Sequence, residues 1–375
     1  MTTAPRHVYV HVPFCARRCS YCDFSIAVRR DVPVSEYLDA LRGELRLRLG
    51  NPDTPRDIDT LYFGGGTPSH LGSEGVTRML ALMREFFRWD SSAEITLEAN
   101  PDDVSPSSAQ AWCDAGITRV SLGAQSFDDG VLRWMHRTHG AAQIDRAVEV
   151  LQDTPFASWS FDLIFALPEA LQRDWQRDLD LALGKRPPHL SLYGLTVEPG
   201  TPLARWAERG EVMATDESAY EREFLGAHAG ALAAGFDHYE VSNFAQAGHH
   251  ARHNRSYWSG VPYLGFGPAA HGFDGRTRRW NVAAYAAWQQ AIGSGRDPEG
   301  GSETIGEGET RLEAVYLGLR TTAGLLVDAE VLEQVSSWVA QGWASVQADR
   351  VVLTALGWLR LDSLAATLTP VRGSP

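Results

Sequence analysis

Two kinds of hydrophobic pattern alternate through the first half of this chain. Short apolar runs rich in β-branched and aromatic residues predict buried strands, and the longer stretches between them, with apolar residues at helical spacing, predict helices. The expected strands are residues 7–12, 60–64, 94–99, 119–125, 159–165 and 189–195. The expected helices are residues 35–49, 72–88, 106–115, 141–152 and 169–183.

This alternation predicts an α/β fold with six parallel strands. Right-handed crossovers wind such units into a curved sheet, here a partial (β/α)6 barrel with its helices outside. In that architecture the connecting loops meet at the carboxyl ends of the strands, where binding and catalytic residues gather. We therefore expect the functional residues of this chain at that edge of the sheet.

The last part of the chain departs from this pattern. A glycine-rich polar segment at residues 293–308 is expected to be a linker. After it, residues 309–320 and 328–341 predict helices, and residues 350–353 with 359–361 predict a short hairpin, so that this part resembles a winged helix. We expect a barrel domain at 1–200, an extension of the barrel at 201–300 and a smaller α+β domain at 301–375.

Composition and charge narrow the class of protein. The 34 Lys and Arg residues against 47 Asp and Glu give a net charge of −13, which argues against a nucleic-acid partner. No run approaches the roughly 18–20 apolar residues of a membrane span, and the first residues lack the apolar core of a signal peptide. The expected location is the cytoplasm, where thiols are reduced.

Three of the four cysteines lie within eight residues, on the loop after the first expected strand. Cys15, Cys19 and Cys22 have Cys-x3-Cys-x2-Cys spacing, which favours a metal site over a disulfide framework. A structural zinc site needs four protein ligands; Cys113 is distant, and His11 stays open as a fourth ligand. Three thiolates suit a [4Fe–4S] cluster that keeps one iron open for a substrate.

This cysteine motif, followed by Tyr21 and Phe24, resembles the signature of the radical S-adenosylmethionine (SAM) superfamily, and the segment FGGGTPS after the second strand extends the likeness. The resemblance implies a [4Fe–4S] cluster whose open iron binds the amino and carboxylate groups of SAM. It also implies binding residues at the strand ends, namely Gly65, Gly66, Thr67 and Glu98 for the methionine part, Arg137 for its carboxylate, Gln125 and Asp162 for the ribose, and Tyr9 beside the cluster.

Two of these residues have an alternative role, and one further segment extends the resemblance. For Glu98 and Arg137, a purely structural hydrogen bond or ion pair stays open as an alternative. Further along, the segment YLGFGPAAHG at residues 263–272 resembles the part of these proteins that closes over the adenine. Its glycines permit a close approach of the backbone.

Over nearly its whole length the chain resembles the oxygen-independent coproporphyrinogen dehydrogenases and the related HemW-type heme chaperones. The dehydrogenases have a further cysteine two positions after the third cluster ligand, where this chain has Phe24. They also have an N-terminal extension, and here only Met1 to Arg6 precede the first expected strand. Both differences argue against decarboxylation of a porphyrinogen.

The segment HHARHNRSYW matches the H-N-x-x-Y-W motif of the chaperone family at His253, Asn254, Tyr257 and Trp258. The resemblance implies that this motif binds heme. Imidazole is a natural axial ligand of heme iron, and aromatic rings cover a porphyrin face well. Spacing alone leaves open whether His253 or one of its neighbours, residues 249 and 250, is the ligand, and whether His253 is instead a hydrogen-bonded core residue.

The resemblance therefore implies a heme chaperone that holds a [4Fe–4S] cluster, SAM and heme and delivers heme to apo-hemoproteins of the respiratory chain. Its other expected partners are an electron donor such as flavodoxin or ferredoxin, and a membrane surface reached through the recipients. Two alternatives remain open at this point. One is a radical enzyme of porphyrin metabolism, such as an oxidative decarboxylase of coproporphyrinogen III. The other is a non-enzymatic iron–sulfur binding module.

Overall fold

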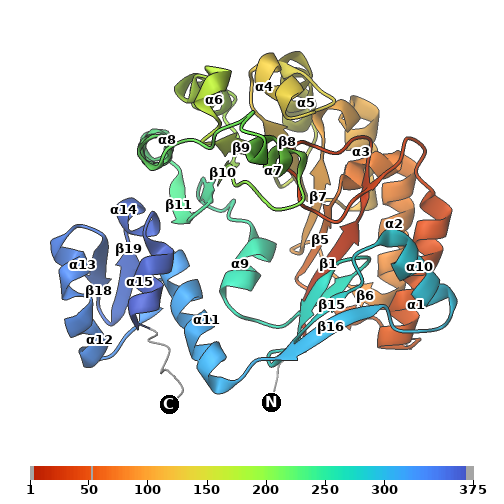
Figure 1. Ribbon diagram of the computed structural model, residues 1–375. Helices are drawn as coiled ribbons and strands as arrows, with labels where there is room; N and C mark the ends of the chain where they lie inside the picture. The colour runs from red at the N-terminus through yellow and green to blue at the C-terminus, as the bar shows by residue number, and fades with distance from the viewer. Residues whose placement is uncertain (1–3, 52–53, 369–375) are drawn as a thin grey trace.

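The computed structural model describes residues 4–51 and 54–368 of the chain (Figure 1). Residues 1–3 and 369–375 lie outside the described residues, and so do the outer ends of the first and third expected domains. A large sheet with helices on its outer side makes up most of the molecule, and a smaller group of helices and strands, blue in Figure 1, makes up the C-terminal part. The three-part division of the chain stays a prediction.

The large sheet confirms the six expected parallel strands, which lie side by side in chain order. Their apolar residues are buried in the core of the sheet and its helices. In β1, for example, Val8, Val10 and Val12 have no exposed surface. A further strand, β13 (Tyr263–Phe266), runs parallel to β1 on its other side. The six are β1 (His7–Val12), β5 (Thr60–Gly65), β7 (Glu94–Ala99), β8 (Arg119–Gln125), β9 (Ser158–Phe165) and β10 (His189–Gly194).

Antiparallel strands extend both ends of this sheet. Beyond β10 lie β12 (Asn243–Ala245) and β11 (Asp237–Glu240), and beyond β13 lie β14 (His271–Phe273), β15 (Thr277–Asn281) and β16 (Glu299–Thr304). The expected linker at residues 293–308 is therefore wrong, because β16 lies within it. A Cβ at Gly301 would lie 2.6 Å from the ring of Trp280 on β15, so the glycine permits close packing of two strands rather than flexibility.

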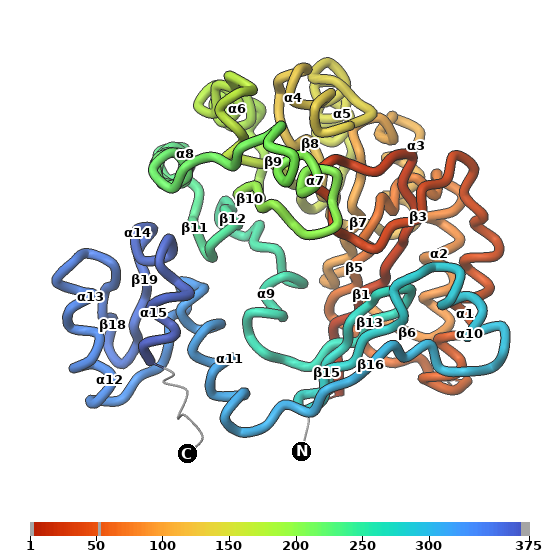
Figure 2. The backbone as a smooth tube through the Cα atoms, viewed as in Figure 1, coloured from red at the N-terminus to blue at the C-terminus, as the bar shows by residue number. Residues whose placement is uncertain are grey.

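Helices cover the outer side of the parallel strands, as Figures 1 and 2 show. The expected helices are confirmed with small shifts of their ends, except the last. There residues 169–171 form a separate 3-10 turn, and α6 begins only after Asp174, whose side chain caps Arg177 N at 3.0 Å. These helices are α1 (Val34–Leu49), α2 (Gly72–Phe86), α3 (Pro106–Ala115), α5 (Ala141–Asp153) and α6 (Trp175–Gly184).

Further helices and short strands connect these units. Figure 2 shows α9 between the parallel strands and α11 (Glu307–Arg320), the first helix of the C-terminal part. The additional helices are α4 (Asp129–Trp134), α7 (Pro202–Glu208), α8 (Glu217–Ala233), α9 (Arg252–Trp258) and α10 (Tyr285–Gly293), and the short strands are β2 (Phe14–Cys15), β3 (Ala27–Val28), β4 (Arg56–Asp57) and β6 (Phe87–Arg88).

The C-terminal part is a small α+β unit, as expected. Its three-stranded antiparallel sheet has the order β17 (Leu325–Leu326), β19 (Arg350–Leu353) and β18 (Ala344–Gln347). The expected hairpin partner at 359–361 is wrong, because β18 takes that place and Thr354 caps a helix instead. The expected helix at 328–341 is split at Val335. The helices are α12 (Ala329–Gln334), α13 (Ser336–Ala340), α14 (Ala355–Trp358) and α15 (Leu361–Leu368).

Helix length and polarity bear on membrane insertion. Within the described ranges, the helices are all too short or too polar to span a lipid bilayer.

Candidate functional site

A cavity of about 520 Å³ lies at the carboxyl ends of the parallel strands. Of the residues expected to hold a cluster and SAM, every one except Tyr9 lines this cavity, although they come from segments spread over some 150 positions of the chain. They are Cys15, Cys19, Cys22, Gly65, Gly66, Thr67, Glu98, Gln125, Arg137 and Asp162. The fold therefore brings the expected residues together where parallel sheets place their binding sites.

The three cysteines of this cavity are free thiols on the loop after β1. Cys15 Sγ lies 3.4 Å from the hydroxyl of Thr67, and Cys19 Sγ accepts a hydrogen bond of 3.3 Å from Arg137 Nη1. Burial raises the pKa of both Cys15 and Cys22 to about 11. Thiols in such a setting become thiolates when a metal supplies positive charge, so the donor set fits an iron–sulfur cluster.

The zinc alternative finds little support in this geometry. His11, its expected fourth ligand, has both ring nitrogens occupied, one by Tyr9 OH at 3.1 Å and one by Ser25 O at 2.8 Å. In the part of the chain that the structure describes, no three His, Cys, Asp or Glu side chains are placed to hold a single metal ion. The ligand role of the cysteines stays a prediction.

The glycine loop after β5 wraps closely over the cysteine loop. Gly65 has a φ of +110°, and a Cβ at Gly66 would lie 2.7 Å from the backbone of Pro13. Gly65 N donates a hydrogen bond of 3.0 Å to Glu98, whose other oxygen accepts the hydroxyl of Tyr62 at 2.8 Å. Both glycines are thus needed for backbone reasons, and one structural role of Glu98 is to hold their loop.

Burial also perturbs the two carboxyl groups of the cavity. It raises the pKa of Glu98 to about 7, against the opposing effect of the hydrogen bond from Tyr62. It raises the pKa of Asp162 to about 6, opposed by hydrogen bonds from Ser121 and Ser191. Two carboxyl groups in one cavity with raised pKa values are typical of a binding site for a cation, which would draw both into the ionised form.

Arg137 is the buried cation of this cavity. Its Nη2 donates to Asn100 Oδ1 at 2.6 Å and to Gly123 O at 2.9 Å, and its Nη1 donates to Cys19. Its buried Nε has no partner among the described residues. Sequence reasoning missed Asn100, although it lies only two positions after Glu98. Arg137 therefore ties the cysteine loop to β7 and β8, and it retains a free donor.

The two residues expected to bind the ribose, Gln125 and Asp162, are held in the cavity in different ways. Gln125 has a φ of +68° and follows a bulge in the pairing of β8 with β9, which turns its side chain into the cavity. Asp162 accepts a hydrogen bond of 2.9 Å from Ser121 on the neighbouring strand. Both the strain at Gln125 and the bulge lie beyond the reach of a hydrophobic pattern.

The residues of the H-N-x-x-Y-W motif point to three different places. His253 is 1% exposed, and its ring nitrogens are hydrogen-bonded to Thr60 Oγ1 at 2.7 Å and to Tyr257 OH at 2.8 Å. Asn254 lines the cysteine cavity, whereas Tyr257 and Trp258 line a second cavity. In this structure His253 is a hydrogen-bonded core residue, and burial lowers its pKa to about 3. Its role as an iron ligand stays a prediction.

The two neighbouring histidines lie away from both cavities. His249 Nδ1 is 3.1 Å from Ser158 Oγ. The ring of His250 packs at a tilt against Tyr239, and its Nε2 is 3.6 Å from a carboxylate oxygen of Asp237. Neither lines the cavity that Tyr257 and Trp258 line.

The second cavity is larger, about 1090 Å³, and lies between the barrel and the C-terminal part. Barrel residues on its wall include Tyr9, and α11 and α15 contribute Leu312 and Ala366. Gly65 and Glu98 line both cavities, so the two adjoin. Sequence reasoning did not find this cavity, because it is formed by helices more than two hundred residues away from β1.

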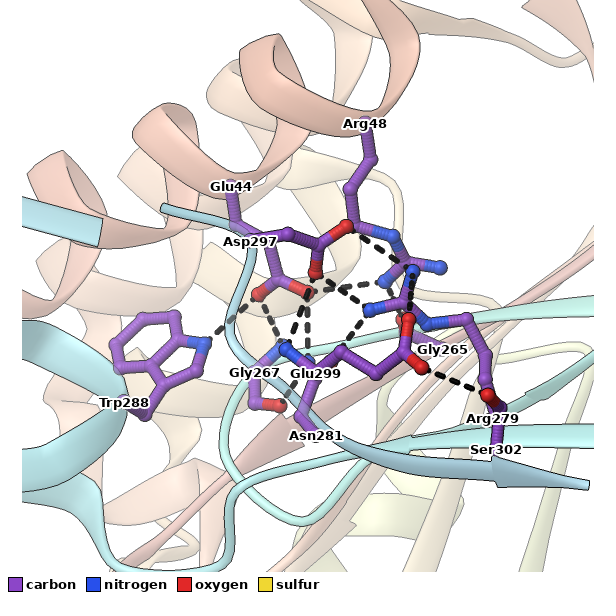
Figure 3. Close-up of polar contacts among 10 residues, drawn as sticks. All are labelled: Glu44, Arg48, Gly265, Gly267, Arg279, Asn281, Trp288, Asp297, Glu299 and Ser302. Carbon is purple, nitrogen blue, oxygen red and sulfur yellow. Dashed lines mark hydrogen bonds and ion pairs between the residues drawn. The ribbon is translucent and has the colours of Figure 1, made fainter. Parts of the chain in front are cut away.

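A buried carboxylate supports the wall of the larger cavity (Figure 3). Glu44 on α1 accepts hydrogen bonds from Gly267 N at 2.8 Å, Asn281 Nδ2 at 2.7 Å and Trp288 Nε1 at 2.9 Å, and it pairs with Arg48 at 3.0 Å. Burial raises the pKa of Glu44, opposed by Arg48 and these donors. The network fixes the loop between β13 and β14, within the segment expected to close over adenine.

Comparison with known proteins agrees with the fold. Residues 9–182 match the sequence model of the Radical SAM superfamily. The structure of Escherichia coli coproporphyrinogen III oxidase (HemN), described as a radical SAM enzyme, superposes with a TM-score of 0.79 over 98% of this chain and 90% of that chain, at 20% identity, which supports the shared fold alone. The chain is a member of the radical SAM superfamily.

Two relatives define its place within that superfamily. The protein named heme chaperone HemW of Mycobacterium tuberculosis (strain CDC 1551 / Oshkosh) is 37% identical over 98% of this chain and 96% of its own length. The protein of the same name from Escherichia coli (strain K12) is 32% identical over 96% of this chain and 97% of its own length. This chain belongs to the HemW family.

Proposed function

We propose that this chain binds heme and passes it to apo-hemoproteins, with a [4Fe–4S] cluster and SAM bound beside the heme. The observation that carries the proposal is the pair of adjoining cavities. One is lined by three thiols, a buried arginine and two carboxyl groups, and the other mainly by aromatic and aliphatic side chains, with charged groups such as Arg278 and Glu313 at its wall. The membership of the HemW family, whose relatives are named heme chaperones, supports this assignment.

Cys15, Cys19 and Cys22 are the proposed cluster ligands, and the cysteine cavity fits the group. A reduced cluster held by these thiolates would supply the electron for cleavage of a carbon–sulfur bond of SAM. The chain's own contribution is to hold the loop. Arg137 donates to Cys19, and Thr67 lies beside Cys15.

The remaining residues of the cysteine cavity are the proposed SAM site. Gly65, Gly66, Thr67 and Glu98 face the methionine part, Arg137 its carboxylate, and Gln125 and Asp162 the ribose, while Tyr9 lies on the wall of the adjoining cavity beside the cluster. A sulfonium cation with an amino-acid end needs both carboxylate and guanidinium partners. The free Nε of Arg137 and the unused lone pairs of Glu98 supply them.

In this proposal, two residues of the H-N-x-x-Y-W motif contact the heme and the other two connect its cavity with the rest of the site. Tyr257 and Trp258 offer aromatic faces to a flat ligand in the larger cavity. His253 and Asn254 connect that wall with the rest of the site, His253 through its hydrogen bond to Tyr257 and Asn254 through the cysteine cavity. The sequence-based role of His253 as the iron ligand requires one of its ring nitrogens to give up its hydrogen bond, either to Tyr257 or to Thr60.

The finer parts of the proposal concern partners and location. We propose that the recipients are respiratory-chain hemoproteins, reached at the membrane surface, and that flavodoxin or ferredoxin supplies the electron. We also propose a cytoplasmic location, which the reduced thiols that a cluster requires support, and no nucleic-acid partner, which the net charge of −13 supports.

The test uses the full chain, purified without oxygen and reconstituted with iron and sulfide. The proposal predicts a cluster absorption band that SAM perturbs, and a separate Soret band on addition of heme. Apo-cytochrome added afterwards should take up the heme more slowly when SAM or reductant is left out. The absence of a heme complex would overturn the proposal.

The same preparation separates the radical-enzyme alternative. Incubation of the reduced protein with SAM and coproporphyrinogen III would yield protoporphyrinogen only if the chain is a decarboxylase. The family relationship does not favour that outcome, since the HemW proteins are named as chaperones and the likeness to the oxidase extends to the fold alone.

A further inference from the structure

The larger cavity has the size and lining of a site for a flat, mostly apolar ligand. Its volume of about 1090 Å³ lies just above the usual range of small-molecule sites, about 300–1,000 Å³. Aromatic rings from several segments line it, among them those of Tyr257, Tyr263 and Tyr316. Aliphatic side chains such as Leu312 and Leu317 cover the side formed by α11.

Two imidazoles reach this cavity, and only one of them has free nitrogens. His11 is 6% exposed and uses both ring nitrogens in hydrogen bonds, to Tyr9 and to the carbonyl of Ser25. His271 makes no side-chain hydrogen bond with another described residue and is exposed to the cavity. An iron ligand must offer an unprotonated nitrogen that nothing else occupies, and His271 meets that condition.

The position of His271 is fixed by the sheet. It lies on β14 opposite Trp280 of β15, and the two rings stack at 5.9 Å with an interplanar angle of 26°. Partial burial and Arg278 lower its pKa, with Glu303 acting against them, which favours the neutral ring. The imidazole is therefore oriented by its neighbour and carries a free lone pair.

The backbone behind His271 is also held firmly. A Cβ at Gly265 of β13 would overlap the carbonyl of His271, so the two strands approach as closely as they do only because residue 265 is glycine. Arg48 donates a hydrogen bond to the carbonyl of Gly265, and Glu44 binds the amide of Gly267 (Figure 3). A ligand on this support keeps its place when an iron atom binds.

We infer that heme binds in the cavity between the barrel and the C-terminal part, with His271 as the axial ligand of its iron. This inference rests on the proposed heme binding and adds to it the place and the ligand. In this inference the iron ligand is a histidine outside the H-N-x-x-Y-W motif. The aromatic residues of that motif form the wall against which the porphyrin lies. It also places the heme beside Gly65 and Glu98, which line the cysteine cavity as well.

The test is a titration of the full chain with ferric heme, followed by its absorption and electron paramagnetic resonance spectra. We compare the unaltered protein with His271→Ala, His253→Ala and, as a matched control, His250→Ala, which changes a histidine outside both cavities. His271→Ala should lose the spectrum of nitrogen-ligated iron and bind heme at least about tenfold more weakly. Added imidazole should restore the ligated spectrum, and His250→Ala should match the unaltered protein.

The outcomes separate this inference from the proposed function. If the unaltered protein binds heme and His271→Ala keeps the same spectrum and affinity, the assignment of His271 is overturned while heme binding stands. If His253→Ala alone loses the ligated spectrum, the ligand is the motif histidine and the assignment is again overturned. If the unaltered protein binds no heme, both the assignment and the proposed function fail.

Discussion

His253 and Tyr257 are joined by a hydrogen bond of 2.8 Å between a ring nitrogen and the phenol oxygen, one turn apart on α9. The other ring nitrogen of His253 is bonded to Thr60 on β5, so the imidazole links the helix to the central sheet. Tyr257 is thereby presented to the larger cavity. Within this motif the histidine positions an aromatic ring, and the ring lines the cavity.

Replacement of His253 by alanine should destabilise the protein strongly. The change removes a buried ring, leaves Tyr257 without its partner, and leaves the hydroxyl of Thr60 with His7 as its remaining partner. We expect the free energy of unfolding to fall by about 2–4 kcal/mol, from the cavity and the lost hydrogen bonds together. Urea denaturation followed by circular dichroism measures it. His250→Ala, at a half-buried position against Tyr239, should cost less, about 1 kcal/mol.

A pH prediction follows from Glu98, whose pKa is raised to about 7 by burial, from an ordinary value of 4.5. Between pH 4.5 and pH 7, Glu98 is therefore protonated in the folded protein and ionised in the unfolded chain. Stability from this group is therefore full below pH 4.5, declines as the pH rises to about 7, and is constant above. Glu98→Gln should remove this slope, so the difference in unfolding free energy between variant and unaltered protein should change by about 2–3 kcal/mol between pH 5 and pH 8.

The measurement uses the protein without its cluster, by urea unfolding at each pH. Glu149→Gln serves as the control, since this glutamate is exposed on α5 and its removal should leave the pH dependence unchanged. A parallel pH profile for Glu98→Gln and the unaltered protein would show that Glu98 titrates normally.

The barrel could be predicted because its strands are apolar runs bounded by turn residues, and the site because each motif follows such a strand. The burial of His253 could not be predicted, because its hydrogen-bond partner Thr60 is 193 positions away in the sequence. The glycines of β16 predicted a linker, because sequence alone does not show that Trp280 packs over Gly301. The larger cavity depends on how α11 and α15 dock, which no local pattern encodes.

The proposed ligand set predicts that serine variants of the four cysteines will differ in their iron and sulfide content. Serine at Cys15, Cys19 or Cys22 should each lower the iron and sulfide content of anaerobically reconstituted protein and weaken the cluster absorption, because a hydroxyl is a poor ligand for iron in such clusters. Cys113→Ser should leave both unchanged, since Cys113 lies on α3 and lines neither cavity. Equal iron content in all four variants would contradict the proposed ligand set.

Gly265→Ala tests the close approach of β13 to β14. A methyl group there overlaps the carbonyl of His271, so the strands must separate or bend. We expect a loss of about 2 kcal/mol or more of unfolding free energy, together with weaker heme binding. Gly308→Ala is the matched control. This exposed glycine in α11 has nothing within 4 Å of a new Cβ, so alanine should be neutral or stabilising by up to about 1 kcal/mol.

Glu44→Gln is the smallest change that tests the network of Figure 3. All the groups around the Glu44 carboxylate are donors, from Gly267, Asn281, Trp288 and Arg48, so an amide in its place must turn its own N–H groups toward one of them. The guanidinium of Arg48 also loses its buried counter-charge. We expect a loss of about 3–5 kcal/mol in the free energy of unfolding, measured by urea denaturation.

A change at another glutamate of the same helix shows whether that loss comes from the network. Glu36 is exposed at the first turn of α1, and Glu36→Gln should alter the unfolding free energy by less than about 0.5 kcal/mol. Because Glu44 fixes the loop that leads to His271, Glu44→Gln should also weaken heme binding, whereas Glu36→Gln should not. If Glu44→Gln destabilises the protein yet binds heme normally, the network stabilises α1 and the barrel without setting the position of His271.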